Sequence, residues 1–182
     1  MPNEQSLPII LKELKLPSIN RHWEAFSQTA QKENWTYPRY LSELAELEMV
    51  TRVQNRIKRQ ITESKLPSGK PLDAFDFEEA RYVNAAQIHA LAENSDWVRD
   101  ASNLILFGPS GVGKTHIAAA IGYALIQQGL RVIFTSTVAL VQRLQQARRD
   151  YKLNEYIARL GRYPLLILDD IGYVKKDEAE TS

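Results

Sequence analysis

Eight consecutive residues near the middle of the chain carry the groups that a phosphate-binding loop needs. They fit the pattern G-x-x-x-x-G-K-[ST] and comprise Gly108, Pro109, Ser110, Gly111, Val112, Gly113, Lys114 and Thr115. The glycines allow a tight turn whose backbone N–H groups face the β- and γ-phosphates of a nucleotide, and Lys114 adds a mobile cation. The Thr115 hydroxyl can ligate Mg²⁺. The spacing predicts a site for ATP and Mg²⁺, with Lys114 as a catalytic residue.

Two adjacent carboxylates follow the last apolar run of the chain. The run Leu165-Leu-Ile-Leu168 predicts a strand that ends at Asp169 and Asp170. Carboxylates at the C-terminal ends of strands in open α/β sheets face the ligand crevice, so we expect Asp169 to hold Mg²⁺ through water. Asp170 is predicted to be the catalytic base that activates the attacking water. The alternative, an ordinary polar strand end, is disfavoured by the phosphate-binding loop upstream.

The segments around these groups predict an α/β fold. Strands are expected at 103–107, 130–135 and 165–168, and helices at 115–128, 138–149 and 153–160. Strands that alternate with helices indicate a parallel sheet with right-handed crossovers. In that arrangement the helix that begins near Lys114 directs its positive dipole end at the phosphates. A Gly-rich turn that binds nothing would not need this strand–loop–helix context.

The first third of the chain is predicted to be helical. Helices are expected at 8–16, at 19–32 with Ser18 as the N-cap, and at 38–63. The breakers in Leu66-Pro-Ser-Gly-Lys-Pro71 indicate a linker, followed by an extended segment at 72–77 and a helix at 78–94. We therefore predict a small all-helical DNA- or partner-binding domain at 1–66, a linker at 67–77 and the N-terminal part of an ATPase domain at 78–182.

Basic side chains on the third predicted helix are candidate DNA contacts. Arg52, Arg56 and Arg59 follow a 4-then-3 spacing and share one face, and Lys58 adds charge beside them. The alternatives are a solvated helix face or a surface for a protein partner. A second basic group has the same ambiguity and consists of Arg143, Arg148, Arg149 and Lys152. Contact with DNA phosphates predicts binding that weakens steeply with salt.

The amino-acid composition excludes several classes of binding site and of protein. The 182 residues contain no cysteine, which excludes disulfides and cysteine-ligated metal sites. His22 and His89 are isolated, and His116, which follows the loop, is expected to be a helix surface or packing residue rather than a metal ligand. The N-terminus lacks the pattern of a signal peptide, and no apolar stretch approaches the roughly 20 residues of a membrane span. We therefore expect a cytoplasmic protein without membrane contact. The net charge of +1 does not discriminate between partners.

Two segments of the chain resemble the IstB-like ATPases. They are Asn103-Leu-Ile-Leu-Phe-Gly-Pro-Ser-Gly-Val-Gly-Lys-Thr-His-Ile-Ala-Ala-Ala-Ile-Gly122 and Leu165-Leu-Ile-Leu-Asp-Asp-Ile-Gly-Tyr173, and Lys70–Phe77 is similar as well. These ATPases are transposition helpers of the AAA+ class, related to the DnaC helicase loaders. The resemblance implies an AAA+ P-loop NTPase fold with a three-layer parallel sheet, and binding of ATP and Mg²⁺. It also implies a homo-oligomer on double-stranded DNA that delivers target DNA to a transposase.

Members of the family continue past Ser182, so the resemblance also implies that this chain is a truncated copy. Their additional residues supply two more strands, a sensor Asn or Thr, an arginine finger and a C-terminal lid. The next strand of the family sheet lies between the strand before the loop and the strand that ends at Asp169. We therefore expect an incomplete sheet and a chain that binds ATP but barely hydrolyses it. Two other functions stay open: a helicase loader that acts through protein contacts, and an inactive truncated copy.

Overall fold

The computed structural model describes residues 6–80 and 82–171, and the chain divides into two compact units. These are Met1–Lys58 and Arg59–Ser182, so the division falls inside the long helix α3 (Tyr37–Ser64). The predicted functional boundaries at 66 and 78 stay predictions. No helix in the described ranges is long and apolar enough to cross a membrane.

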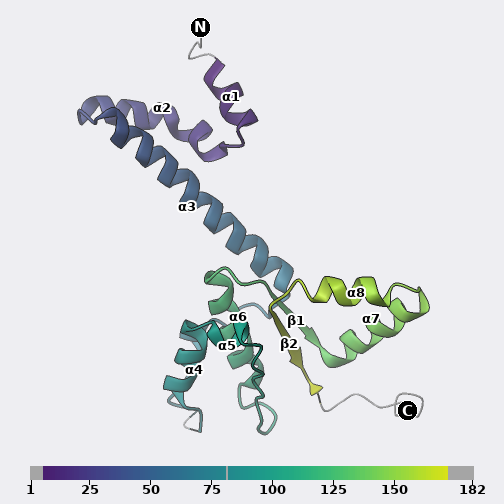
Figure 1. Ribbon diagram of the computed structural model, residues 1–182. Helices are drawn as coiled ribbons and strands as arrows, with labels where there is room; N and C mark the ends of the chain where they lie inside the picture. Colours follow the sequence, from purple (N-terminus) through teal and green to yellow (C-terminus); the bar gives the residue numbers. More distant parts are fainter. Residues whose placement is uncertain (1–5, 81, 172–182) are drawn as a thin grey trace. The chain divides into compact units, whose positions relative to one another are not determined.

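The first unit is helical, as predicted. It contains α1 (Leu7–Glu13), α2 (Pro17–Lys32) and the first part of α3, with α1 packed against α2 (Figure 1). Leu11 and Leu44 are buried. Phe26 and Trp35 meet edge to face with ring centroids 6.4 Å apart, where the chain turns from α2 into α3. Buried apolar side chains and this aromatic contact therefore contribute to the packing of the unit.

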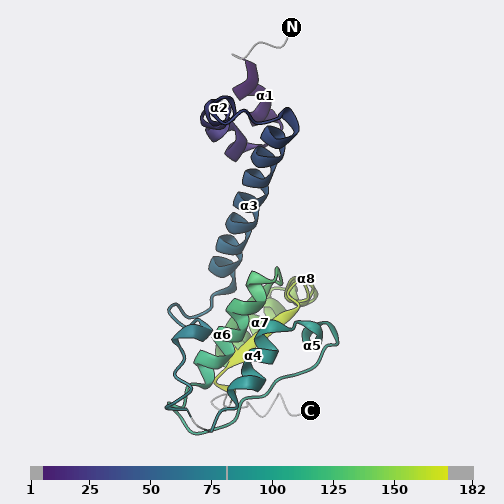
Figure 2. The same ribbon diagram turned by 90° about the vertical axis from the view of Figure 1, so that its left-hand side faces the viewer.

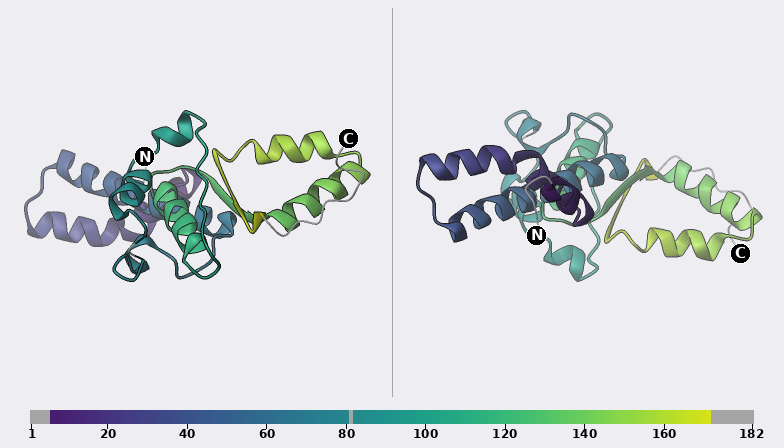
Figure 3. Two further views of the ribbon diagram at one scale, coloured as in Figure 1. Left: turned by 90° about the horizontal axis from the view of Figure 1, so that it is seen from below. Right: turned by 90° about the horizontal axis from the view of Figure 1, so that it is seen from above.

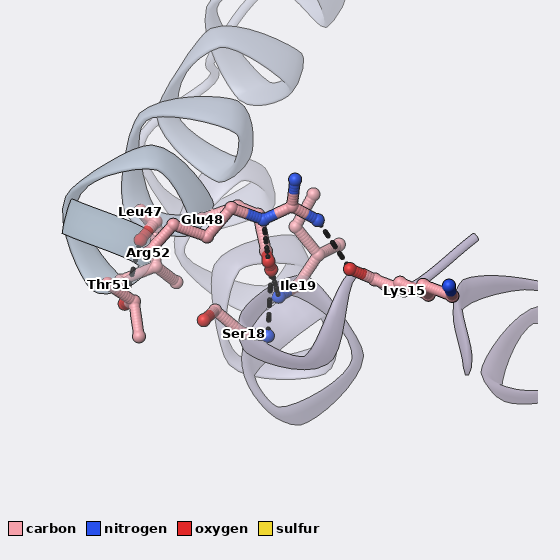
Figure 4. Close-up of polar contacts among 7 residues, drawn as sticks. All are labelled: Lys15, Ser18, Ile19, Leu47, Glu48, Thr51 and Arg52. Carbon is pink, nitrogen blue, oxygen red and sulfur yellow. Dashed lines mark hydrogen bonds and ion pairs between the residues drawn. The ribbon is translucent and has the colours of Figure 1, made fainter. Parts of the chain in front are cut away.

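The N-terminus of α2 is capped by a side chain from α3 (Figure 4). Glu48 Oε2 accepts hydrogen bonds from the backbone N–H groups of Ser18, at 2.8 Å, and Ile19, at 3.2 Å. The prediction of Ser18 as the N-cap is wrong because α2 already begins at Pro17, which places Ser18 inside the first turn. A carboxylate near helical N–H groups satisfies unpaired donors and interacts favourably with the helix dipole.

Arg52 completes this capping network. Its Nε donates to Glu48 Oε1 at 2.8 Å, and its guanidinium also donates to the carbonyl of Lys15 (Figure 4). Glu48 is only 3% exposed. Burial raises the pKa of Glu48, but the hydrogen bonds from Arg52 and from the two amides, with the Arg52 charge, bring the pKa below its ordinary value. The ionised carboxylate is thus the form that the folded unit stabilises.

Glu48→Gln is expected to destabilise the first unit by about 1–3 kcal/mol at neutral pH, since it weakens hydrogen bonds that are buried and charge-assisted. The native pKa lies below the unfolded one, so the stabilisation is present above the unfolded pKa, about 4.3, and is lost as the pH falls through the lowered native value. Urea unfolding followed by circular dichroism should show a stability difference at pH 7 that narrows at acidic pH. Glu46→Gln, an exposed change on the same helix, is the matched control; equal unfolding of the two variants would contradict the capping role.

The second unit is an α/β structure. Its elements are η2 (Leu72–Ala74), α4 (Ala85–Glu93), α5 (Asp96–Arg99), α6 (Lys114–Gln127), β1 (Val132–Ser136), α7 (Thr137–Arg149), α8 (Leu153–Leu160) and β2 (Leu165–Asp169). Within the described residues, β1 and β2 form a parallel two-stranded sheet, with Val132 opposite Leu165 and Ser136 opposite Asp169. The predicted parallel α/β class is therefore confirmed.

Helix α6 forms the centre of this unit. It packs against both strands and against α4 (Figure 2), and its buried apolar side chains are Ile117, Ala119, Ala120, Ile121, Leu125 and Ile126. A Cβ atom at Gly122 would lie 3.0 Å from Ile167 Cδ1 and 3.0 Å from Leu66 Cδ2. The missing side chain at Gly122 therefore lets α6 approach β2 closely.

Helices α7 and α8 form a hairpin that links the two strands. They lie side by side and extend away from α6, as the two views of Figure 3 show. At the turn between them Tyr151 is 98% exposed. This crossover leads from the C-terminal end of β1 back to the start of β2, as a parallel pair requires.

The prediction of a buried strand at 103–107 is wrong. These residues form no strand, and Ile105 and Phe107 are 62% and 87% exposed. A strand is stable only with a hydrogen-bonded neighbour, and no described strand pairs with this segment. Its apolar side chains accordingly have no sheet to pack into.

Two predictions for residues 72–94 also need correction. The segment 72–77, expected to be extended, contains the short 3₁₀ helix η2. The helix expected from residue 78 begins only at Ala85, because Asn84 caps it: its Oδ1 accepts a hydrogen bond from Gln87 N at 3.1 Å. The strong N-cap preference of Asn sets the boundary here.

Candidate nucleotide-binding site

The loop at 108–115 leads directly into the N-terminus of α6. Gly113 is the N-cap, and its φ of +89° lies in the left-handed region that favours glycine. Ile117 N donates to Gly113 O at 2.9 Å, which is the first hydrogen bond of the helix. The N–H groups of the first turn have no partners within the helix, and together with the helix dipole they favour an anion at this place.

Lys114 folds back over the loop. Its Nζ donates to Gly108 O at 2.9 Å and to Pro109 O at 2.7 Å. These bonds use two of the three donors of an ammonium group. The cation is thus held at the loop itself, where its remaining donor and its charge suit a phosphate oxygen.

Thr115 and Asp169 meet at the end of β2, although they lie 54 residues apart in sequence. The Thr115 Oγ1 is 3.2 Å from Asp169 Oδ1 and 3.1 Å from Asp169 Oδ2. The Thr137 hydroxyl donates to the backbone carbonyl of Asp169 at 3.0 Å. The first turn of α6 and the first residue of α7 therefore both hold Asp169 in place.

The Thr115 hydroxyl and the Asp169 carboxylate are suitable ligands for Mg²⁺. The ion prefers hydroxyl, carboxylate and water oxygens, and in nucleotide sites it is held by few protein groups together with phosphates. Thr115 would hold the ion through its hydroxyl, and Asp169 would hold it through a bound water. Both side chains are partly exposed, so water and a ligand can reach them.

Asp170 follows directly but is placed differently. It is exposed, and its φ of +57° lies in the left-handed region, which Asp tolerates better than most residues. The chain therefore turns immediately after the strand, and the two carboxylates do not share an environment. The role of Asp170 as the catalytic base stays a prediction.

Two aromatic residues near the loop were not identified from the sequence. The Tyr82 hydroxyl donates to Val112 O at 2.8 Å, and the ring of Phe75 lies against Gly113. His116, for which a helix surface or packing role was expected, packs edge to face with Phe75, with centroids 5.2 Å apart. Isolated aromatic residues in an irregular segment have no motif spacing, so the sequence contained no signal for these contacts.

The basic residues of α3 differ in what they contact. Arg52 binds Glu48 and the Lys15 carbonyl, so it has a structural role. Arg59 lies 3.9 Å from Glu63, and both side chains are largely exposed. Arg56 and Lys58 are exposed as well. The shared helical face predicted from the spacing therefore contains one residue that already belongs to the fold.

The second basic group lies on the α7–α8 hairpin. Its four members, Arg143, Arg148, Arg149 and Lys152, are all exposed. Arg148 and Arg149 end α7 and Lys152 directly precedes α8, so these three residues flank the turn at Tyr151. Positive charge is thus concentrated at the tip of the hairpin.

Comparison with known proteins gives a consistent result. Residues 9–182 match the sequence model of the family described as IstB-like ATP binding protein. An insertion sequence ATP-binding protein of Sinorhizobium fredii is 48% identical over 180 residues, which cover 99% of this chain and 60% of that protein. The IS5376 ATP-binding protein of Geobacillus stearothermophilus is 34% identical, covering 90% of this chain and 65% of its own length.

A third relative is the IS21 ATP-binding protein of Pseudomonas aeruginosa, 31% identical over 97% of this chain and 66% of its own length. The chain thus spans between 60% and 66% of the length of these three relatives. The family match covers nearly the whole chain and includes both the loop before α6 and Asp169 at the end of β2. On this basis the chain belongs to the family of IstB-like ATP binding proteins.

Proposed function

We propose that this chain is an ATP-binding helper protein for DNA transposition, which binds double-stranded DNA and delivers target DNA to a transposase. The observation that carries the ATP site is the contact between the Thr115 hydroxyl and the Asp169 carboxylate beside the N-terminus of α6. The printed names of the relatives, insertion sequence ATP-binding proteins, support the transposition context. These names favour a transposition helper over a helicase loader.

In this proposal each group of residues in the site has a separate role. The backbone N–H groups of the loop at 108–115, which all its residues except Pro109 provide, and the Lys114 ammonium bind the β- and γ-phosphates of ATP. Thr115 and Asp169 hold Mg²⁺, which when bound neutralises charge on the phosphate oxygens. Asp170 accepts a proton from the attacking water and orients it. The helix dipole of α6 adds a fixed positive potential at the phosphates.

Lys114→Ala is expected to abolish measurable ATP binding. The lysine supplies the cation of the loop, and losing one partner of a charge-assisted contact that the bound nucleotide buries costs on the order of 2–5 kcal/mol, about 30- to 5,000-fold in affinity. Isothermal titration calorimetry with ATP and Mg²⁺ measures this directly. Lys32→Ala, at the exposed end of α2, should bind like the wild type. Equal affinity of the Lys114 variant and the wild type would refute the site.

For DNA we propose two contact regions, each formed by exposed basic side chains. The first is the part of α3 with Arg56, Lys58 and Arg59, and the second is the hairpin tip with Arg148, Arg149 and Lys152. Arg52 is left out because its guanidinium serves the Glu48 network. When the protein binds DNA we propose that it does so as a homo-oligomer, with the transposase as a further partner.

Replacing Arg56 and Arg59 with Ala should weaken DNA binding equally for all sequences. It should also flatten the salt dependence by about one unit of slope per lost phosphate contact. The same measurement on Arg148→Ala with Arg149→Ala tests the hairpin tip. Arg21→Ala with Lys32→Ala removes equal charge from α2 and is the control. An unchanged slope in both test pairs would mean that these residues belong to the solvated surface. A discrete complex with a replicative helicase in the absence of DNA would favour the helicase-loader function instead.

The 182-residue chain is expected to turn over ATP slowly. Hydrolysis depends on the position of the attacking water, and a misplacement of about 1 Å can cost about a hundredfold in rate. The segment 103–107, which leads into the loop, is unpaired among the described residues, so no sheet hydrogen bonds fix the strand side of the loop relative to β2. Steady-state ATPase assays should give at least about a hundredfold higher turnover for a version extended to the length of the relatives. Similar turnover in both would contradict the expectation.

A further inference from the structure

The segment before α4 contacts the phosphate-binding loop at two places and the first turn of α6 at a third. We call Pro71, Phe75, Phe77 and Tyr82 the strap. The carbonyl of Pro71 lies 3.1 Å from His116 Nε2, in the first turn of α6. The ring of Phe75 lies against Gly113, and the Tyr82 hydroxyl donates to Val112 O at 2.8 Å. These three contacts all fall on residues 112–116, at the junction of the loop and α6.

Phe75 occupies the space where a side chain at Gly113 would be. A Cβ atom built on Gly113 would lie only 2.7 Å from Phe75 Cε2. The ring itself is fixed from two sides, edge to face with Phe77 at 4.8 Å and with His116 at 5.2 Å between centroids. Phe77 in turn packs against the ring of His89 on α4, 5.5 Å away. Aromatic contacts therefore tie the loop backbone at Gly113 to α4 and α6.

Tyr82 acts on the peptide group just before Gly113. In a trans peptide the C=O and N–H bonds point in opposite directions. A hydrogen bond that holds the Val112 carbonyl towards Tyr82 therefore directs the Gly113 N–H away from Tyr82. Phe75 restricts the same peptide from the Gly113 side. The two side chains together fix the orientation of one amide donor of the loop.

We propose that Phe75 and Tyr82 are positioning residues that hold the Val112–Gly113 peptide ready for a nucleotide phosphate. This inference rests on the proposed function, in which the amides of residues 108–115 bind the phosphates of ATP. A loop whose amides are already oriented loses less conformational entropy when the phosphate binds. The strap therefore raises the affinity for a nucleoside triphosphate through the peptide that it holds.

The decisive variant is Tyr82→Phe, because it removes only the hydroxyl of a side chain that is 65% exposed. The affinity for ATP, measured by calorimetry with Mg²⁺, should fall about 2- to 10-fold, the range of one hydrogen bond. The thermal midpoint of the nucleotide-free chain should stay within a degree or so of the wild type, since surface changes of this size alter stability little. Tyr151→Phe, at a tyrosine that is 98% exposed, is the matched control and should change neither value.

Phe75→Ala should lower the affinity further, by at least about tenfold, because it frees the Gly113 side of the peptide. The combined variant should lose less than the product of the two single losses, since both side chains act on one peptide. Hydrogen exchange adds an independent readout: ATP should protect the amides of residues 111–113 less in Tyr82→Phe than in the wild type.

The outcomes separate this inference from the ATP site itself. If the wild type and Lys114→Ala bind ATP equally, the proposed function fails. If the wild type binds ATP, Lys114→Ala does not, and Tyr82→Phe binds like Tyr151→Phe, then the strap inference alone is overturned. A fall in affinity of Tyr82→Phe that is matched by a large fall in its thermal midpoint would also overturn it, because the residue would then be merely structural.

Discussion

The contact between Thr115 and Asp169 is the constraint on which the candidate site depends. One residue lies in the first turn of α6 and the other ends β2, and their oxygens approach to 3.1 Å. This approach requires that the helix N-terminus and the C-terminal end of the strand lie at the same edge of the unit. A parallel α/β arrangement provides that geometry, because the carboxyl ends of its strands and the N-termini of its helices lie at the same edge. Ligands of open α/β sheets bind at this edge.

The packing of α6 makes the contact possible. Ile121, Leu125 and Ile126 are almost fully buried, and at Gly122 the helix surface approaches Ile167 without an intervening side chain. A side chain at Gly122 would require the ends of the Ile167 and Leu66 side chains to move, because its Cβ would lie 3.0 Å from each. The hydrophobic core and the polar site are therefore coupled, since the distance between helix and strand sets both.

In the helical unit, two charged side chains, Glu48 and Arg52, stabilise the fold. Glu48 is buried with two backbone amides and Arg52 around its carboxylate, an arrangement that satisfies the open end of α2. Leaving such a carboxylate without partners would be costly, so Arg52 has limited freedom to bind anything else. Basic residues at similar spacing on one helix therefore differ in their availability for nucleic acid, and only their contacts distinguish them.

The features of this protein that depend on local chemistry can be predicted from its amino-acid sequence. The loop at 108–115, the strand that ends at Asp169, the helices outside residues 72–99 and the parallel α/β class follow from residue type, spacing and periodicity, which act over a few neighbours in the chain. The features that depend on contacts between residues far apart in the sequence are visible only in the tertiary structure. Residues 103–107 have the composition of a buried strand but lack a described neighbour to pair with. Glu48 caps a helix 30 residues earlier, and Tyr82 holds a carbonyl 30 residues later. Such contacts depend on how elements pack in space, and no local pattern encodes that packing.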